Sequence, residues 1–338
     1  MEIQLKINHT KYSFMVAPGT SLLQVLRNAG FFGAKFGGCK KGECGACTVL
    51  LDGQAVNSCS MLAAQAQGHE IETIEGIGEH PDQGWRKTEG LHVLQDAFAE
   101  SGAIQCGYCT PAMVLSAKAL FDHNGKASEE EIREAVSGVL CRCTGYKKPV
   151  EAIKAAIAVK NGLLEKENLA EVVKQNCMPQ MDLVPEARQF NTVGKPDAKV
   201  DAIKLVQGKA AYTADVDLSN VLIARVLFSP VAHARIKRID VEKARNLPGV
   251  QAVLTYKDIP RVIFSTAGQS EPIPGPLDTF SLDNKVRFVG DRVAFVAADN
   301  AEIAEAALKL IDVEYEELPP LLDSREAMNT GAPILHDE

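Results

Sequence analysis

Nine cysteines are the most reactive side chains in this sequence of 338 residues, and eight of them fall into two groups of four. The first quartet is Cys39, Cys44, Cys47 and Cys59, the second quartet is Cys106, Cys109, Cys141 and Cys143, and Cys177 is left over. The chain is too long to be a disulfide-stapled mini-domain. In a reducing compartment, clustered thiolates bind metal more often than they pair with one another. Both quartets are therefore predicted metal sites.

The first quartet has the spacing C-x4-C-x2-C-x11-C, and its first three cysteines match the plant-type [2Fe–2S] pattern. Nearby glycines would let the loop bend sharply and point its N–H groups at the sulfurs; they are Gly37, Gly38, Gly42 and Gly45. A zinc knuckle or unliganded thiols are the alternatives, although zinc sites usually combine two C-x2-C pairs. The fourth cysteine follows more closely than in an isolated ferredoxin, which indicates a ferredoxin module within a larger enzyme.

The second quartet combines a C-x2-C pair with a C-x-C pair in a segment with helical periodicity. Structural zinc is the alternative here, since paired cysteines on helices also hold zinc. A C-x-C pair is less usual for zinc, and the neighbouring first quartet favours a second iron–sulfur cluster. A Rieske centre would need two histidine ligands, but His123 is the only histidine between Cys109 and Cys141.

Three motifs around these cysteines resemble the iron–sulfur region of the molybdenum hydroxylases, the xanthine oxidase and aldehyde oxidoreductase family. They read GGCKKGECGACTV from Gly37, QCGYCTP from Gln105 and LCRCTGY from Leu140. The resemblance covers residues 1 to about 160. From about residue 194 the sequence also resembles the hammerhead domain of that family. The segments GQSEPIPGPLD and AALKLIDVEYE are most similar to its selenium-dependent xanthine dehydrogenase branch.

The resemblance implies a role for each matched residue. The second quartet would hold the cluster nearest a molybdopterin cofactor, and the first quartet would hold a cluster nearer a flavin. Gln105 would hydrogen-bond the pterin, and Cys143 would be both an iron ligand and a pterin contact. Without the flanking motif, Gln105 would be interpreted as a residue that satisfies a helix end. The resemblance implies no catalytic residue within this chain.

The function implied is that of an iron–sulfur subunit that passes electrons from a molybdopterin site through two [2Fe–2S] clusters toward FAD on another subunit. The expected partners are a molybdenum-binding large subunit, without which the chain would be inactive, and an FAD-binding subunit. The expected substrate is a purine such as xanthine, or another N-heterocycle. An aldehyde oxidoreductase subunit and a stand-alone two-cluster electron-transfer protein are the alternatives. The hammerhead-like half argues against the second, because a free ferredoxin does not need it.

Local patterns predict the elements that must position these residues. Alternating apolar residues predict a hairpin at residues 3–16, Thr20 could cap a helix over Ser21–Ala29, and strands are expected on both sides of Asp52-Gly53. Helices are expected at about 88–100, 111–122, 128–137 and 149–161. Strand-like segments at 221–228, 250–254 and 292–298 precede a helix at 302–311.

These elements predict an α+β multidomain chain. Residues 1–76 would form a β-grasp, plant-type ferredoxin-like domain, and residues 77–163 would form a four-helix [2Fe–2S] domain. Residues 164–195 are polar, contain Pro179 and Pro185, and are interpreted as a linker. Residues 196–338 would form the α+β hammerhead-like domain.

Composition excludes several other classes of protein. The net charge of −8 without a block of like charges argues against a nucleic-acid partner. No window is apolar enough for a membrane span. Glu2 and Lys6 lie where a signal peptide needs its apolar core, so a cytoplasmic protein is expected. Gly76-Ile77-Gly78 lacks the third glycine of a dinucleotide fingerprint, so flavin is expected on another subunit.

Overall fold

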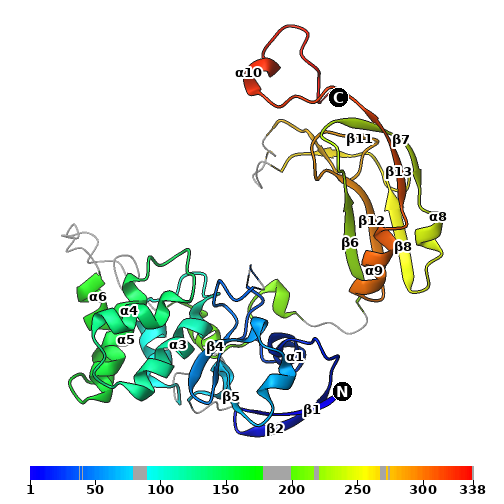
Figure 1. The fold of residues 1–338 in the computed structure, drawn as a ribbon. Helices are drawn as coiled ribbons and strands as arrows, with labels where there is room; N and C mark the ends of the chain where they lie inside the picture. The colour runs from blue at the N-terminus through cyan, green and yellow to red at the C-terminus, as the bar shows by residue number, and fades with distance from the viewer. Residues whose placement is uncertain are drawn as a thin grey trace. The chain divides into compact units, whose positions relative to one another are not determined.

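The computed structural model describes residues 1–37, 39, 41–78, 90–177, 199–216, 221–266, 272 and 275–336. The chain divides into two compact units, Met1–Val216 and Asp217–Glu338 (Figure 1). Gly38, both linker prolines and most of the GQSEPIPGPLD segment lie outside the described residues. Within the described residues, no helix is both long and apolar enough to cross a membrane.

A five-stranded mixed sheet with one short helix opens the first unit. Its strand order is β2-β1-β5-β3-β4, and β1 and β5 are parallel while the other neighbours are antiparallel. The elements are β1 (Glu2–Ile7), β2 (Thr10–Met15), α1 (Leu22–Asn28), β3 (Thr48–Leu51), β4 (Gln54–Asn57) and β5 (Glu70–Glu72). Alternate residues of β1 are buried, which confirms the predicted hairpin. The predicted Thr20 cap is wrong, because the Ser21 side chain accepts the cap hydrogen bond from Gln24 N at 3.2 Å.

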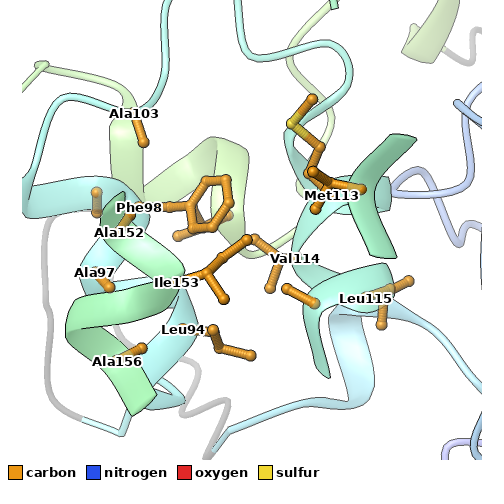
Figure 2. Packing of buried hydrophobic residues seen from close by; sticks show 14 of the residues in the cluster. Leu94, Ala97, Phe98, Ala103, Met113, Val114, Leu115, Ala152, Ile153 and Ala156 are labelled. Atoms are coloured by element: carbon orange, nitrogen blue, oxygen red, sulfur yellow. The ribbon is translucent and has the colours of Figure 1, made fainter. Parts of the chain in front are cut away.

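Helices follow as predicted, and they share one apolar core. They are α2 (Val93–Glu100), α3 (Thr110–His123), α4 (Glu129–Ser137) and α5 (Lys147–Lys160). Figure 2 shows Phe98 of α2, Val114 of α3 and Ile153 of α5 converging, and all three are fully buried. α3 also packs against β3, so the helices and the sheet form one unit.

Two further helices, α6 and α7, lie outside the segments where helices are expected from the sequence. α6 (Leu169–Cys177) falls within the expected linker and packs on α5 through Leu169 and Val173, its two residues described as buried. α7 (Ala202–Val206) and the 3-10 helix Thr213–Asp215 lie in residues 199–216, which belong to the first unit. From the sequence, residues 199–216 are expected at the start of the hammerhead-like domain, whereas in the structure they pack with the first unit. Residues 178–195 of the expected linker lie outside the described residues.

The second unit contains two three-stranded antiparallel sheets, β6-β12-β8 and β11-β7-β13, and a short β9-β10 ribbon. The strands are β6 (Ile223–Phe228), β7 (Ala234–Asp240), β8 (Val250–Thr255), β9 (Ile263–Phe264), β10 (Thr279–Phe280), β11 (Lys285–Val286), β12 (Arg292–Ala298) and β13 (Asp312–Glu317). The helices are α8 (Glu242–Arg245), α9 (Ala301–Leu308) and α10 (Ser324–Ala327). The central strand β12 buries Val293, Ala294, Val296 and Ala298, and α9 packs on this sheet (Figure 1).

Candidate metal centres

The first quartet lies on one loop and one short 3-10 helix of the β-sheet domain. Cys39, Cys44 and Cys47 lie between α1 and β3, and Cys59 lies in the 3-10 helix Ser58–Ser60 that follows β4. Lys35 N donates to Ala46 O at 3.1 Å and so closes the base of the loop. Local backbone bonds therefore bring all four cysteines to one end of the sheet.

Cys39 and Cys44 form the first close pair of thiols, with their sulfurs 3.3 Å apart. The backbone N–H groups of Lys41 and Cys44 each donate to Cys39 Sγ at 3.4 Å, and these bonds lower the pKa of Cys39 to about 6. A Cβ atom built on Gly37 would lie 2.3 Å from Cys44 Sγ, so a glycine is needed where the chain passes this sulfur. The predicted role of the loop amides is present at Cys39.

Cys47 and Cys59 form the second close pair. Burial raises the pKa of Cys47 to about 12, and the adjacent Cys59 side chain adds to the increase. Asn57 supports this side of the loop, because its Nδ2 donates to Gly42 O at 2.8 Å while its Oδ1 lies 3.9 Å from Cys47 Sγ. Asn57 was not predicted from the sequence, because it is one of the eleven residues between Cys47 and Cys59 and nothing in the spacing distinguishes it from the others.

The second quartet lies at the N-terminal ends of two helices. Cys109 is the N-cap residue of α3, and Cys141 and Cys143 lie in the short loop before α5. Cys106 lies beside Cys143, and Cys109 lies beside Cys141. Burial, followed by neighbouring thiols, raises the pKa of Cys109. The positive end of a helix dipole favours an anionic thiolate or cluster at such a position.

Two residues of the LCRCTGY motif hold the ligand loop in place, and neither was assigned a role from the sequence. The Tyr146 hydroxyl accepts from Cys141 N at 2.8 Å and donates to Val139 O at 3.1 Å. Thr144 Oγ1 lies 3.2 Å from Cys141 Sγ. Burial acts to raise the pKa of Cys141, but hydrogen bonds with Thr144, Cys143 and Cys109 together lower it overall. Their place in the motif was the available signal.

Each quartet is therefore arranged as two pairs of thiols. A [2Fe–2S] cluster has four cysteine ligands, two for each iron, so the donor set of each quartet fits this group. Within the described residues, no three histidine, cysteine, aspartate or glutamate side chains are grouped as ligands of a single ion. Pairs of neighbouring thiols fit a [2Fe–2S] cluster, in which each iron has two cysteine ligands.

A close backbone contact joins the two sites. Leu140 N donates to Cys44 O at 2.9 Å, and Leu140 immediately precedes Cys141. Gly45 has a φ of +67°, and a Cβ atom at this position would lie 2.1 Å from Gly138 O. Only a residue without a side chain fits there, so Gly45 lets a ligand of the first quartet approach a ligand of the second.

The outer edge of the second quartet is accessible. Cys106 and Cys143 are exposed, and Gln105 next to Cys106 is exposed as well. Cys109 and Cys141 are only partly exposed. The structure therefore leaves the predicted pterin-contacting residues Gln105 and Cys143 open to a group outside this unit.

Comparison with known proteins accounts for three segments of the chain. Residues 5–73 match the family described as 2Fe-2S iron-sulfur cluster binding domain, and residues 73–154 match the [2Fe-2S] binding domain. Residues 207–319 match the a/b hammerhead domain of aldehyde oxidase and xanthine dehydrogenase. The nicotinate dehydrogenase small FeS subunit of Eubacterium barkeri is 44% identical over 155 residues, which cover 46% of this chain and 94% of that protein. The chain belongs to the molybdenum hydroxylase family.

Longer members of the molybdenum hydroxylase family match the chain from end to end. The probable hypoxanthine oxidase XdhD of Escherichia coli (strain K12) is 36% identical over 339 residues, covering 100% of this chain and 33% of that protein. The solved structure of the aldehyde oxidoreductase from Desulfovibrio desulfuricans superposes with a TM-score of 0.81 at 32% identity, covering 99% of this chain and 36% of that one. The chain thus spans about a third of the length of these relatives. It carries the family's two [2Fe–2S] binding domains and its hammerhead domain.

Proposed function

We propose that this chain is the electron-transfer part of a molybdenum-dependent hydroxylase and that its eight quartet cysteines each bind iron. The observation that carries the proposal is the arrangement of both quartets as two thiol pairs, joined by the Leu140 N to Cys44 O hydrogen bond. When bound, [2Fe–2S] clusters accept and release single electrons. The protein itself supplies thiolates, amide donors and a short covalent and hydrogen-bonded connection between Cys44 and Cys141.

The exposed edge of the second quartet suggests the direction of electron transfer through this chain. Gln105 and Cys143 would contact a molybdopterin held by a partner subunit, because they are exposed beside ligand positions. The first quartet would face an FAD-binding subunit. Its Cys47 is buried, and its loop is closed by the chain's own backbone. The second quartet would thus receive electrons and the first would deliver them.

Metal content is the first test of this proposal. The purified chain should contain about four iron atoms and about four acid-labile sulfides, and dithionite should develop two distinct paramagnetic signals. Stoichiometric zinc with little iron would contradict the proposed clusters. A single paramagnetic signal would show that one of the two quartets does not hold a cluster.

We infer the class of substrate from the names of two relatives and not from a pocket of this chain. A purine such as hypoxanthine or xanthine is favoured by the relative named as a hypoxanthine oxidase, and an aldehyde by the relative named as an aldehyde oxidoreductase. Assembled with a molybdenum-binding partner, the clusters should be reduced by hypoxanthine and not by acetaldehyde. Reduction by acetaldehyde and not by hypoxanthine would identify an aldehyde as the substrate. Reduction by nicotinate alone would assign another N-heterocycle, and reduction by none of the three compounds would refute the hydroxylase role.

A further inference from the structure

The segment at residues 199–216, here called the bridging segment, contacts three consecutive residues of a predicted ligand loop. The Tyr212 hydroxyl donates to Cys106 O at 2.7 Å. Leu205 covers Gly107 so closely that a Cβ atom there would lie 2.5 Å from Leu205 Cδ1. The rings of Tyr108 and Tyr212 lie 5.0 Å apart at an interplanar angle of 67°. The loop at Cys106–Tyr108 is thus held from outside its own domain sequence.

A buried ionic cluster anchors the other end of the bridging segment. The Asp215 carboxylate lies 2.7 Å from Arg27 Nη1 and 2.9 Å from Lys35 Nζ, and the three side chains are 5% exposed or less. Asp215 also accepts from the backbone N–H groups of Ala211 and Tyr212. Burial of one carboxylate between two cations is favourable only while all three are present, because removing one partner leaves an uncompensated charge.

The same ionic cluster reaches the tyrosine that touches the ligand loop. Lys35 Nζ lies 4.8 Å from the centre of the Tyr212 ring, a cation–π distance. Arg27 Nη2 donates to Ala214 O at 2.8 Å, and Gln95 of α2 donates to Val206 O at 2.7 Å. The bridging segment is therefore fixed to the sheet domain through Arg27 and Lys35, and to the helical domain through Gln95.

We propose that Tyr212 and Asp215 are positioning residues for the loop that contains Cys106, and that the bridging segment thereby sets the redox properties of the cluster in the second quartet. This inference rests on the proposed role of Cys106 as an iron ligand. Hydrogen-bond donors around a cluster stabilise the additional negative charge of its reduced form. The Tyr212 hydroxyl donates to the main-chain carbonyl of Cys106 and so fixes the peptides of this loop, whose N–H groups are the donors nearest its sulfurs, and Asp215 holds the Tyr212 backbone in place.

Tyr212→Phe in the full chain is the direct test, because it removes the hydroxyl and keeps the ring. The cluster of the second quartet should become harder to reduce in a potentiometric titration followed by paramagnetic resonance, and its g-values should shift. The signal and potential of the other cluster should stay unchanged. Tyr256→Phe, in the second unit, is the matched control and should change neither cluster. An unaltered second cluster, or a change confined to the first, would overturn the proposal.

Asp215→Asn provides a second test that does not depend on bound iron. It leaves the buried charges of Arg27 and Lys35 uncompensated, so amide hydrogen exchange should become about tenfold faster or more in residues 106–108 and 202–216. Adding Lys35→Met should restore part of the protection, because it removes one of the two cations. Unchanged exchange in residues 106–108 would refute the positioning contact. If the wild-type chain held no clusters while Asp215→Asn still loosened this loop, the proposed function and the redox role of the bridging segment would fail, and the positioning of the Cys106 loop by Asp215 would stand.

Discussion

The two quartets contain four cysteines each, but they are assembled from different parts of the chain. The first is built locally, because its cysteines span residues 39–59 and its loop is closed by Lys35 and Ala46. The second joins the ends of two helices that are far apart in sequence, and the bridging segment holds its Cys106 loop from a further hundred residues away. Cys47 of the first quartet is buried, whereas Cys106 and Cys143 of the second are exposed. Local closure suits a site that takes shape within one short stretch of chain, and exposed ligands at helix ends suit contact with another cofactor.

Loss of one partly exposed ligand, Cys109, should distinguish the two quartets most strongly. Cys109→Ser should remove the second cluster and lower the iron content from about four to about two atoms per chain, while the first cluster's signal persists. Cys177→Ser is the control and should retain both clusters, since Cys177 belongs to neither quartet. Iron, sulfide and spin quantitation measure the outcome. Loss of both clusters in Cys109→Ser would show that the two sites do not form independently.

Gly45→Ala should disturb the contact between the quartets. The new Cβ would meet Gly138 O at 2.1 Å, and Gly53→Ala is a matched control, because Gly53 also has positive φ but has no atom within 4 Å of its Cβ position. We expect Gly45→Ala to destabilise the first unit by about 3 kcal/mol more than Gly53→Ala and to slow electron exchange between the clusters. Thermal unfolding and rapid-mixing reduction kinetics test both effects. Equal behaviour of the two variants would mean that the contact is not tight.

Tyr146→Phe should affect the second quartet alone. It deprives Cys141 N and Val139 O of their common partner, and leaving buried polar groups unpaired should cost about 2 kcal/mol. The spectrum of the second cluster should change and that of the first should not. Tyr12→Phe in the sheet domain is the control, and denaturant titration with paramagnetic resonance provides the measurement. A change in both spectra would contradict separate support of the two sites.

Acid should weaken the helical domain more than the sheet domain. Burial lowers the pKa of His92 to about 4, so the unfolded chain binds the proton first and the stability contributed by neutral His92 is lost as the pH falls from about 6.5 toward 4. Between pH 6.5 and 5 this amounts to about 1.5 kcal/mol. His92→Asn should flatten this dependence while retaining a capping side chain. His69→Asn, which alters a half-exposed histidine of the sheet domain, should not flatten it.

Sequence patterns predicted the local part of the molecule well. The hairpin and the four helices depend on neighbouring residues, and the structure contains them. Residues 169–177, expected within a linker, form α6, because Leu169, Val172 and Val173 have a helical period that was overlooked in a polar segment. β7 (Ala234–Asp240) was overlooked because its ARIKRID sequence is largely charged.

The candidate sites show the same limit. Cysteine spacing predicts two quartets, and the structure shows four pairs of neighbouring cysteines, Cys39 with Cys44, Cys47 with Cys59, Cys106 with Cys143 and Cys109 with Cys141. The contacts of Tyr212 and Asp215 join residues more than a hundred positions apart, and no local pattern encodes such a contact. Asp215 in particular resembles an ordinary surface carboxylate in the sequence and is buried only because two distant cations meet it.

The position of β5 determines the order in which the two sites can be completed during synthesis. β5 is the last strand of its sheet to be made, yet it lies between β1 and β3. Before it emerges, the nascent domain can form only two separate hairpins, β1-β2 and β3-β4, joined by the cysteine loop. The first quartet thus gains its complete sheet once residue 72 has left the ribosome, and its contact with Leu140 follows. The Cys106 loop gains its last contacts only after residue 215, so the chain finishes the support of the first quartet well before that of the second.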